Sequence, residues 1–296
     1  MRELVVVSGK GGTGKTSLTA AFASLATNNL LCDADVDAAD LHLLLKPEIR
    51  RCVDFMGGGK ASINLEHCSR CDLCRDLCRF AAIDEEYVID GIACEGCGVC
   101  VDLCPAQAID FPIQKCGEWF VSDTRVGPMV HARLGIAEEN SGKLVSCIRQ
   151  EARKLVEEKG LELIITDGPP GIGCPVIAAI GGATALVLIV EPTVSGLHDM
   201  TRLADLARHF KTPCLLCVNK FDLNVEMTQK MEEMALQRRM TVLGRVPYDP
   251  LFTRAMIVEQ TVIEYQKDSE TARAVREVWD GILGSPAMKS YGIRSM

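Results

Sequence analysis

Leu4-Val5-Val6-Val7-Ser8-Gly9-Lys10-Gly11-Gly12-Thr13-Gly14-Lys15-Thr16 joins a short apolar run to a glycine-rich loop that ends in a lysine and a threonine. The run Leu4–Val7 is typical of a buried parallel strand, and Thr16–Ala26 has the composition of a helix. The loop fits G-x-x-x-x-G-K-[ST], whose glycines let backbone N–H groups wrap closely around phosphates, while the lysine and the final hydroxyl serve the β- and γ-phosphates and Mg²⁺. The sequence therefore predicts a nucleotide site formed by Gly9, Lys10, Gly11, Gly12, Thr13, Gly14, Lys15, Thr16 and Ser17.

Strands and helices alternate along most of the remaining chain. Apolar runs predict strands, and longer mixed segments predict helices. The predicted strands are Leu30–Cys32, Leu163–Thr166, Ala185–Val190 and Cys214–Val218, and the predicted helices are Lys143–Lys159, Leu203–Phe210 and Val225–Arg239. Such alternation predicts an α/β P-loop NTPase fold, with a mostly parallel sheet covered by helices on both faces.

A cysteine-rich segment interrupts this alternation. It follows Gly57-Gly58-Gly59, which we expect to be a flexible joint, and Pro112 closes it. We therefore predict a P-loop domain in two parts, residues 1–58 and 114–296, with a small α+β insert at 59–113.

The insert contains two cysteine runs that fit C-x2-C-x2-C-x3-C, offset by 26 residues. In this spacing three neighbouring thiolates bind one 4Fe–4S cluster and the fourth cysteine serves the other cluster. Zinc is the competing metal, but four-cysteine zinc sites use two C-x2-C pairs separated by a spacer. The predicted ligands are Cys68, Cys71, Cys74 and Cys104 for one cluster, and Cys94, Cys97, Cys100 and Cys78 for the second. The segment resembles the bacterial two-cluster ferredoxins, with Arg79 where that family usually has proline.

The glycine loop carries a second lysine, Lys10, and in this it resembles the deviant Walker A loop of the MinD/ParA/Mrp/nitrogenase iron-protein class. The resemblance implies a homodimer in which Lys10 touches the partner subunit's nucleotide. It also implies that Asp35 orients the attacking water, and that Asp33 and Asp167 hold Mg²⁺ through water. Gly168-Pro169-Pro170-Gly171 resembles the Mrp-type switch II. The expected catalytic residues are Lys10, Lys15, Asp35 and Asp167.

The sequence is compatible with either guanine or adenine as the base of the bound nucleotide. Asn219-Lys220-Phe221-Asp222 fits N-K-x-D, in which GTPases read guanine through the aspartate. MinD-like ATPases have a similar segment and use the asparagine for adenine, and Pro247-Tyr248 resembles their base-flanking loop. We expect ATP rather than GTP, with Asn219, Asp222, Pro247 and Tyr248 at the base.

Seven of the 15 cysteines lie outside the two runs. Cys174 follows Asp167 by seven residues, the same offset as the cluster ligand in switch II of nitrogenase iron proteins. A third cluster that bridges a dimer would need a second cysteine from each subunit, and Cys147 is the only loose candidate. Packing as a small apolar side chain is the alternative for both residues.

Composition excludes several classes of protein. The net charge of −8 gives no basic footprint for nucleic acid, and the longest apolar stretch is too short to cross a membrane. The tail Gly284–Met296 lacks the basic amphipathic face of a membrane-binding helix. Cysteines in a reducing compartment are more often metal ligands than disulfides. We expect a cytoplasmic protein.

Three functions are compatible with these features. The first is an ATP-gated redox protein whose two clusters exchange electrons with a redox partner. The second is an Mrp-like ATPase that assembles iron–sulfur clusters or carries them to an acceptor, although eight well-spaced ligands favour a tight site. The third is a positioning ATPase like MinD or ParA. We expect the first, with slow, partner-stimulated hydrolysis of ATP.

Overall fold

The computed structural model describes residues 1–135 and 140–289, and these residues divide into two compact units. The P-loop unit comprises residues 1–52, 120–132 and 141 onwards, and the cysteine unit comprises residues 53–119 and 133–140. The predicted insert 59–113 falls within the cysteine unit. The strands β3 (Glu48–Gly59) and β6 (Ile113–Thr124) each have residues in both units.

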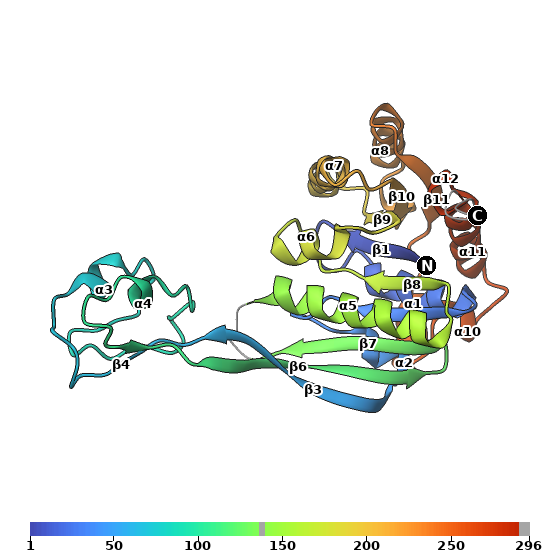
Figure 1. Cartoon of the computed structure of the whole chain (residues 1–296). Coiled ribbons are helices and arrows are strands. Elements are labelled where there is room, and N and C mark those ends of the chain that lie inside the picture. The colour runs from blue at the N-terminus through green and yellow to red at the C-terminus, as the bar shows by residue number, and fades with distance from the viewer. Residues whose placement is uncertain (136–139, 290–296) are drawn as a thin grey trace, which may run out of the picture. The chain divides into compact units, whose positions relative to one another are not determined.

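A nine-stranded sheet has the order β11-β10-β9-β1-β8-β2-β7-β6-β3 (Figure 1). From β11 to β7 every pair of neighbouring strands is parallel. These strands are β1 (Arg2–Ser8), β2 (Asn29–Asp33), β7 (Gly127–Leu134), β8 (Leu163–Asp167), β9 (Ala185–Val190), β10 (Cys214–Asn219) and β11 (Thr241–Val246). The α/β fold and the mostly parallel sheet predicted from the sequence are confirmed.

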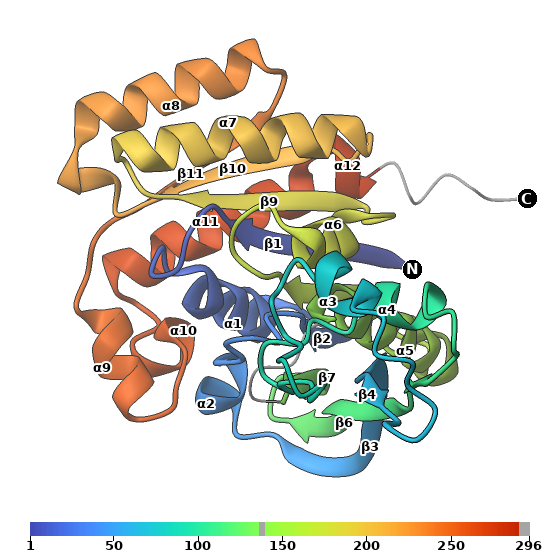
Figure 2. The same cartoon turned by 90° about the vertical axis from the view of Figure 1, so that its left-hand side faces the viewer.

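Helices cover both faces of this sheet (Figure 2). One face carries α1 (Lys15–Leu25), α2 (Leu41–Leu45), α9 (Leu251–Ile257), α10 (Val262–Tyr265) and α11 (Glu270–Gly284). The other carries α5 (Ser141–Lys159), α6 (Cys174–Ile180), α7 (Val194–His209) and α8 (Val225–Gln237). Two short helices, η1 (Phe221–Leu223) and α12 (Pro286–Lys289), complete the P-loop unit. None of the helices within 1–135 and 140–289 is both long and apolar enough to cross a membrane. The last seven residues of the tail considered above lie outside the described part.

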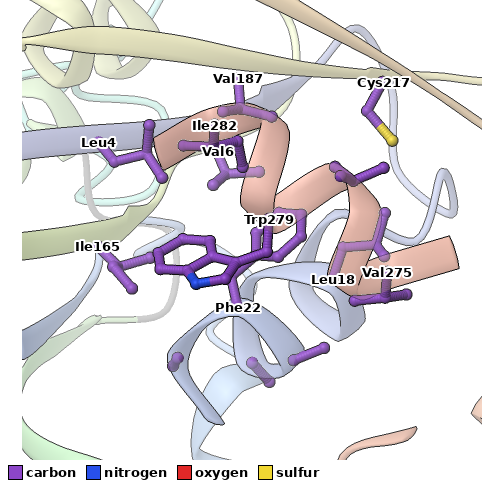
Figure 3. Packing of buried hydrophobic residues seen from close by; sticks show 14 of the residues in the cluster. Leu4, Val6, Leu18, Phe22, Ile165, Val187, Cys217, Val275, Trp279 and Ile282 are labelled. Atoms are coloured by element: carbon purple, nitrogen blue, oxygen red, sulfur yellow. The ribbon is translucent and has the colours of Figure 1, made fainter. Parts of the chain in front are cut away.

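The core of the P-loop unit lies between α1, α11 and the central strands (Figure 3). Leu4 and Val6 of β1 are completely buried there. Phe22 of α1 stacks on Trp279 of α11 with 5.7 Å between ring centroids. Because β1 is buried on both faces, its residues do not alternate between apolar and polar side chains. This burial explains the continuous apolar run in the sequence.

The cysteine unit has little regular structure. Between residues 60 and 112 it contains the two-residue strands β4 (Ser62–Ile63) and β5 (Ile109–Asp110), which pair antiparallel. Its helices α3 (Leu73–Leu77) and α4 (Val99–Asp102) each span about one turn, and neither has a buried residue.

One sequence expectation for this region differs from the structure, and some strands were not predicted. Gly57-Gly58-Gly59 was expected to be a flexible joint, but it forms the end of strand β3. Phe111 and Phe55 lie within 2.7 Å of where Cβ atoms on Gly59 and Gly57 would be, so these glycines make room for aromatic rings. The strands β6 and β7 were not predicted. A two-residue turn joins them into a hairpin.

Candidate functional site

The glycine loop lies between β1 and α1, as the motif predicts. Gly12 and Gly14 have φ angles of 80° and 86°, in the left-handed region that favours glycine. A Cβ atom on Gly14 would lie 2.4 Å from Nδ2 of Asn219, so no larger residue fits there without displacing that side chain. The loop and its surroundings form an open cavity of about 390 Å³, lined by Lys10, Gly11, Gly12, Thr13, Gly14, Lys15, Thr16, Ser17, Asp35 and neighbouring residues.

Lys15 lies between two of the predicted catalytic carboxylates. Its Nζ is 2.9 Å from Oδ1 of Asp167 and 3.2 Å from Oδ2 of Asp35. Burial disfavours the ammonium charge, but the two carboxylates outweigh burial and raise the pKa of Lys15. Thr16 donates a hydrogen bond from Oγ1 to Oδ2 of Asp167 at 2.8 Å. The structure thus gathers a cation, a hydroxyl and two carboxylates within one hydrogen-bonded group at the head of α1.

The third carboxylate, Asp33, is fully buried at the end of β2, and β2 and β8 place it in register with Asp167. Its Oδ1 accepts the backbone N–H of Asp35 at 3.2 Å, and its Oδ2 accepts that of Leu41 at 3.3 Å. Burial, and then repulsion by Asp167, raise the pKa of Asp33 well above its usual value. Asp33 therefore shapes the loop that carries Asp35, and its predicted contact with Mg²⁺ through water stays a prediction.

A second cavity of about 150 Å³ shares Gly14 and Ser17 with the first and is lined by Asn219, Lys220, Pro247, Tyr248 and neighbouring residues. Asn219 donates from Nδ2 to the carbonyl of Thr13 at 2.7 Å, and its buried Oδ1 has no partner among the described residues. Asp222 does not line this cavity. Its carboxylate accepts the backbone N–H of Tyr248 at 2.7 Å, so it fixes the loop at Tyr248.

Two further cavities lie in the cysteine unit. The first cysteine cavity, about 20 Å³, is lined by Cys68, Cys71, Cys74 and Cys104. The second cysteine cavity, about 30 Å³, is lined by Cys78, Cys94, Cys97 and Cys100. Each set contains three cysteines of one run and the fourth cysteine of the other run, which is the grouping expected from the spacing.

The backbone around the two cysteine cavities repeats with the 26-residue offset of the sequence. Left-handed φ angles recur in pairs at Arg70 and Gly96, at Asp72 and Gly98, and at Ala81 and Gln107. Backbone N–H groups also point at cysteine sulfur. Ala82 donates to Sγ of Cys78 and Ala108 donates to Sγ of Cys104, both at 3.4 Å. Non-glycine residues adopt such φ angles only where the surroundings require them, and N–H groups directed at sulfur stabilise thiolates.

The remaining cysteines do not form a comparable group. Cys174 is exposed at the start of α6, and Cys147 is half-buried in α5, where burial raises its thiol pKa. Cys217 is buried and Cys214 half-buried in β10, and burial raises the pKa of each to about 12. These two are apolar packing residues of that strand, as expected from their position.

Sequence reasoning missed Glu191, which follows β9 directly. Its carboxylate pairs with Lys10, at 3.3 Å, and with Lys220. Lys220 has a left-handed φ of 57° and also donates to the carbonyl of Gly12 at 2.9 Å. The position of Glu191 after the apolar run Ala185–Val190, beside the strand that leads into the loop, was the available signal.

Comparisons with known proteins agree with this geometry. Residues 4–262 match the family model described as the CobQ/CobB/MinD/ParA nucleotide binding domain. An uncharacterised protein of Methanocaldococcus jannaschii is 31% identical over 282 residues, which cover 94% of this chain and 95% of that protein. An uncharacterised ATP-binding protein of the same organism is 22% identical, over 95% of this chain and 88% of its own.

Among solved structures, the chain resembles the septum site-determining protein MinD of Pyrococcus horikoshii OT3, complexed with Mg-ADP. That match has a TM-score of 0.60 and 18% identity, and covers 99% of this chain and 98% of the other. A complex of Cyanothece McdA with ATP matches with a TM-score of 0.58 and 16% identity, over 100% of this chain and 98% of the other. At these identities the likeness shows the fold.

Proposed function

Because the chain belongs to the CobQ/CobB/MinD/ParA nucleotide-binding family and is a P-loop ATPase, we propose that it is an ATP-driven dimeric switch that carries two 4Fe–4S clusters and exchanges electrons with a redox partner. The observation that carries the proposal is the pair of cavities, each ringed by four cysteines drawn from both runs.

The cysteines fit a cubane cluster better than a single metal ion. In residues 1–135 and 140–289, no group of three or more His, Cys, Asp or Glu side chains is close enough to hold one ion. A zinc ion needs four sulfurs converging at about 2.3 Å. A cubane instead takes each thiolate at a separate iron, so its ligands stand around a cavity. Bound clusters of this kind accept and release single electrons.

In the P-loop unit, Lys15 would exchange its carboxylate partners for the β- and γ-phosphates of ATP, and Thr16 would ligate Mg²⁺. Lys15 would thereby release Asp35 to orient the attacking water, while Asp167 stays hydrogen-bonded to Thr16. Asn219 supports adenine over guanine, because its buried Oδ1 can accept the exocyclic amine of adenine but would face the carbonyl oxygen of guanine.

The experiment that tests the proposal measures iron and electron paramagnetic resonance (EPR) of protein purified anaerobically, with and without Mg-ATP. We expect about eight irons per chain and an EPR signal that changes on addition of Mg-ATP. Lys15→Ala should abolish the ATP effect and leave the iron content unchanged, while Lys154→Ala, which removes an exposed lysine of α5, should change neither. A chain without iron, or with zinc, would refute the proposal.

A second candidate is a positioning ATPase, and the comparisons support it better than they support electron transfer, because the similar solved structures include MinD. Sedimentation with DNA or with anionic liposomes in the presence of Mg-ATP distinguishes the two. ATP-dependent sedimentation without an ATP effect on the EPR signal would favour positioning. Transfer of clusters to an apo-acceptor would favour the Mrp-like carrier.

A further inference from the structure

Glu191 lies next to the glycine loop because of the strand order. β1 and β9 are parallel neighbours, and their register pairs Ser8 with Ile189. The chain leaves both strands at the same edge of the sheet, so Lys10 and Glu191 come together although 181 residues separate them. The contact between Lys10 and Glu191 is therefore a consequence of the strand order.

The carboxylate of Glu191 holds two lysines at once. Its Oε2 is 3.3 Å from Nζ of Lys10, and its Oε1 pairs with Nζ of Lys220. The side chain of Glu191 is only 14% exposed, whereas that of Lys10 is 40% exposed. A charge pair that is partly shielded from water is less screened by salt than an exposed pair. Lys10 therefore has a favourable partner within its own chain.

We propose that Glu191 is a positioning residue that competes with the partner subunit's nucleotide for Lys10 and so sets how readily the ATP-bound dimer forms. This inference rests on the proposed dimer, in which Lys10 reaches across the interface. One ammonium group cannot pair fully with Glu191 and with a phosphate of the other subunit. The free energy of the Lys10–Glu191 pair is therefore subtracted from that of dimer formation.

Because of Lys220, the effect of Glu191 on Lys10 can be tested apart from any effect of Glu191 on the shape of the loop. It ties Glu191 to the loop through the carbonyl of Gly12 and does not depend on Lys10. In Glu191→Gln the amide oxygen still accepts a hydrogen bond from Lys220, but the negative charge that attracts Lys10 is gone. The substitution should thus leave the loop in place and free Lys10.

The test measures the dimer dissociation constant by analytical ultracentrifugation with Mg²⁺ and a non-hydrolysable ATP analogue. Glu191→Gln should tighten the dimer by up to roughly 25-fold, because each of the two subunits gives up one partly exposed ion pair that is worth at most about fivefold. Lys10→Ala should weaken the dimer, and the double variant should behave like Lys10→Ala alone, because Glu191 acts through Lys10. The binding constant of the analogue for the monomer should be the same in Glu191→Gln as in the wild type.

Glu232→Gln is the matched control, since Glu232 is 19% exposed and pairs with Arg245. It removes one negative charge from the chain and should leave the dimer unchanged. A weaker dimer in Glu191→Gln, or the same tightening in the Lys10→Ala background, would overturn the inference. If Glu191→Gln does not fold, Glu191→Asp, which withdraws the carboxylate by one methylene, should tighten the dimer less. A wild-type chain that stays monomeric with the analogue would refute the proposed dimer itself.

Discussion

The P-loop unit and the cysteine unit are built on different physical principles. Leu4, Val6 and Phe22 in the P-loop unit are completely buried, and they belong to one continuous apolar core. Between residues 60 and 112, by contrast, the buried apolar residues are small in number, and none is completely covered: Ala61, Ala82, Tyr87, Ala108 and Ile109. A segment with so little core cannot offset the entropy of ordering its backbone by burial alone. The difference motivates the proposal that metal ligation supplies in the cysteine unit what apolar packing supplies in the P-loop unit.

Removal of iron is the strongest test of this difference. In chelator-treated, cluster-free protein we expect residues 60–112 to lose most of their hydrogen-exchange protection, because ligand binding and folding are coupled in small metal-dependent units. The strands β1, β8 and β9 should keep theirs. Hydrogen exchange with mass spectrometry resolves the two regions in one sample. Unchanged protection of residues 60–112 would mean that the cysteine unit folds without metal.

Cys97→Ser tests the division of the cysteines between the two cavities. It removes one ligand of the second cysteine cavity, and we expect iron to fall from about eight to about four atoms per chain while nucleotide binding is retained. Cys52→Ser, at an exposed cysteine of β3 outside both cavities, should keep all the iron. Equal loss in the two variants would contradict the assignment. Iron analysis and nucleotide titration make the comparison.

In both units, the features that the sequence predicted correctly are those that depend on residues close together in the chain. The range Ala185–Val190 was predicted correctly to the residue, since strands buried on both faces read as unbroken apolar runs. The grouping of the eight cysteines follows from spacing alone. The hairpin of β6 and β7 was missed because its residues alternate irregularly between buried and exposed, as in the half-buried stretch Ile113–Thr124.

In the candidate site too, local motifs were predictable from the sequence and contacts between distant segments were not. The Gly9–Thr16 loop is a local motif, so its position was predictable. The pairing of Glu191 with Lys10 depends on which strands are neighbours, and the hydrogen bond from the backbone N–H of Tyr248 to Asp222 joins two loops that are far apart in the chain. Contacts of this kind arise from tertiary structure: a single sequence shows that Glu191 follows a strand, but not the strand order that brings it to Lys10.

Acid should act on the P-loop unit through His131 of β7. Its Nε2 lies 2.9 Å from Oγ of Ser122, and its ring stacks on Phe120. Burial, aided by His42, lowers the pKa of His131 to about 4 from 6.5, so the unfolded chain takes up this proton first as pH falls. The associated stability is present above pH 6.5 and is lost progressively toward pH 4, by about 2 kcal/mol between pH 7.5 and pH 5. Urea unfolding at these two pH values measures it, with His131→Gln as the variant in which this loss should be absent.

The smallest expected effect is a difference in reduction potential between clusters bound in the two cysteine cavities. Asp72 lines the first cysteine cavity, and its repeat equivalent is Gly98 at the second. The carboxylate of Asp72 accepts hydrogen bonds from Arg75 at 2.8 Å and from the hydroxyl of Tyr87 at 2.9 Å, and these bonds lower its pKa. It is therefore negatively charged at neutral pH and disfavours reduction of a cluster beside it.

Asp72→Asn removes this charge next to one cavity only. We expect one of the two reduction steps to move to a more positive potential, on the order of tens of millivolts, while the other stays in place, because charge near a cluster tunes its potential. A redox titration followed by EPR resolves the two steps. Asp76→Asn, at an exposed position of α3 that lines neither cavity, is the control and should shift neither step. An equal shift of both steps in Asp72→Asn would mean that the two sites respond to overall charge, and the asymmetry between Asp72 and Gly98 would then have no electrochemical role.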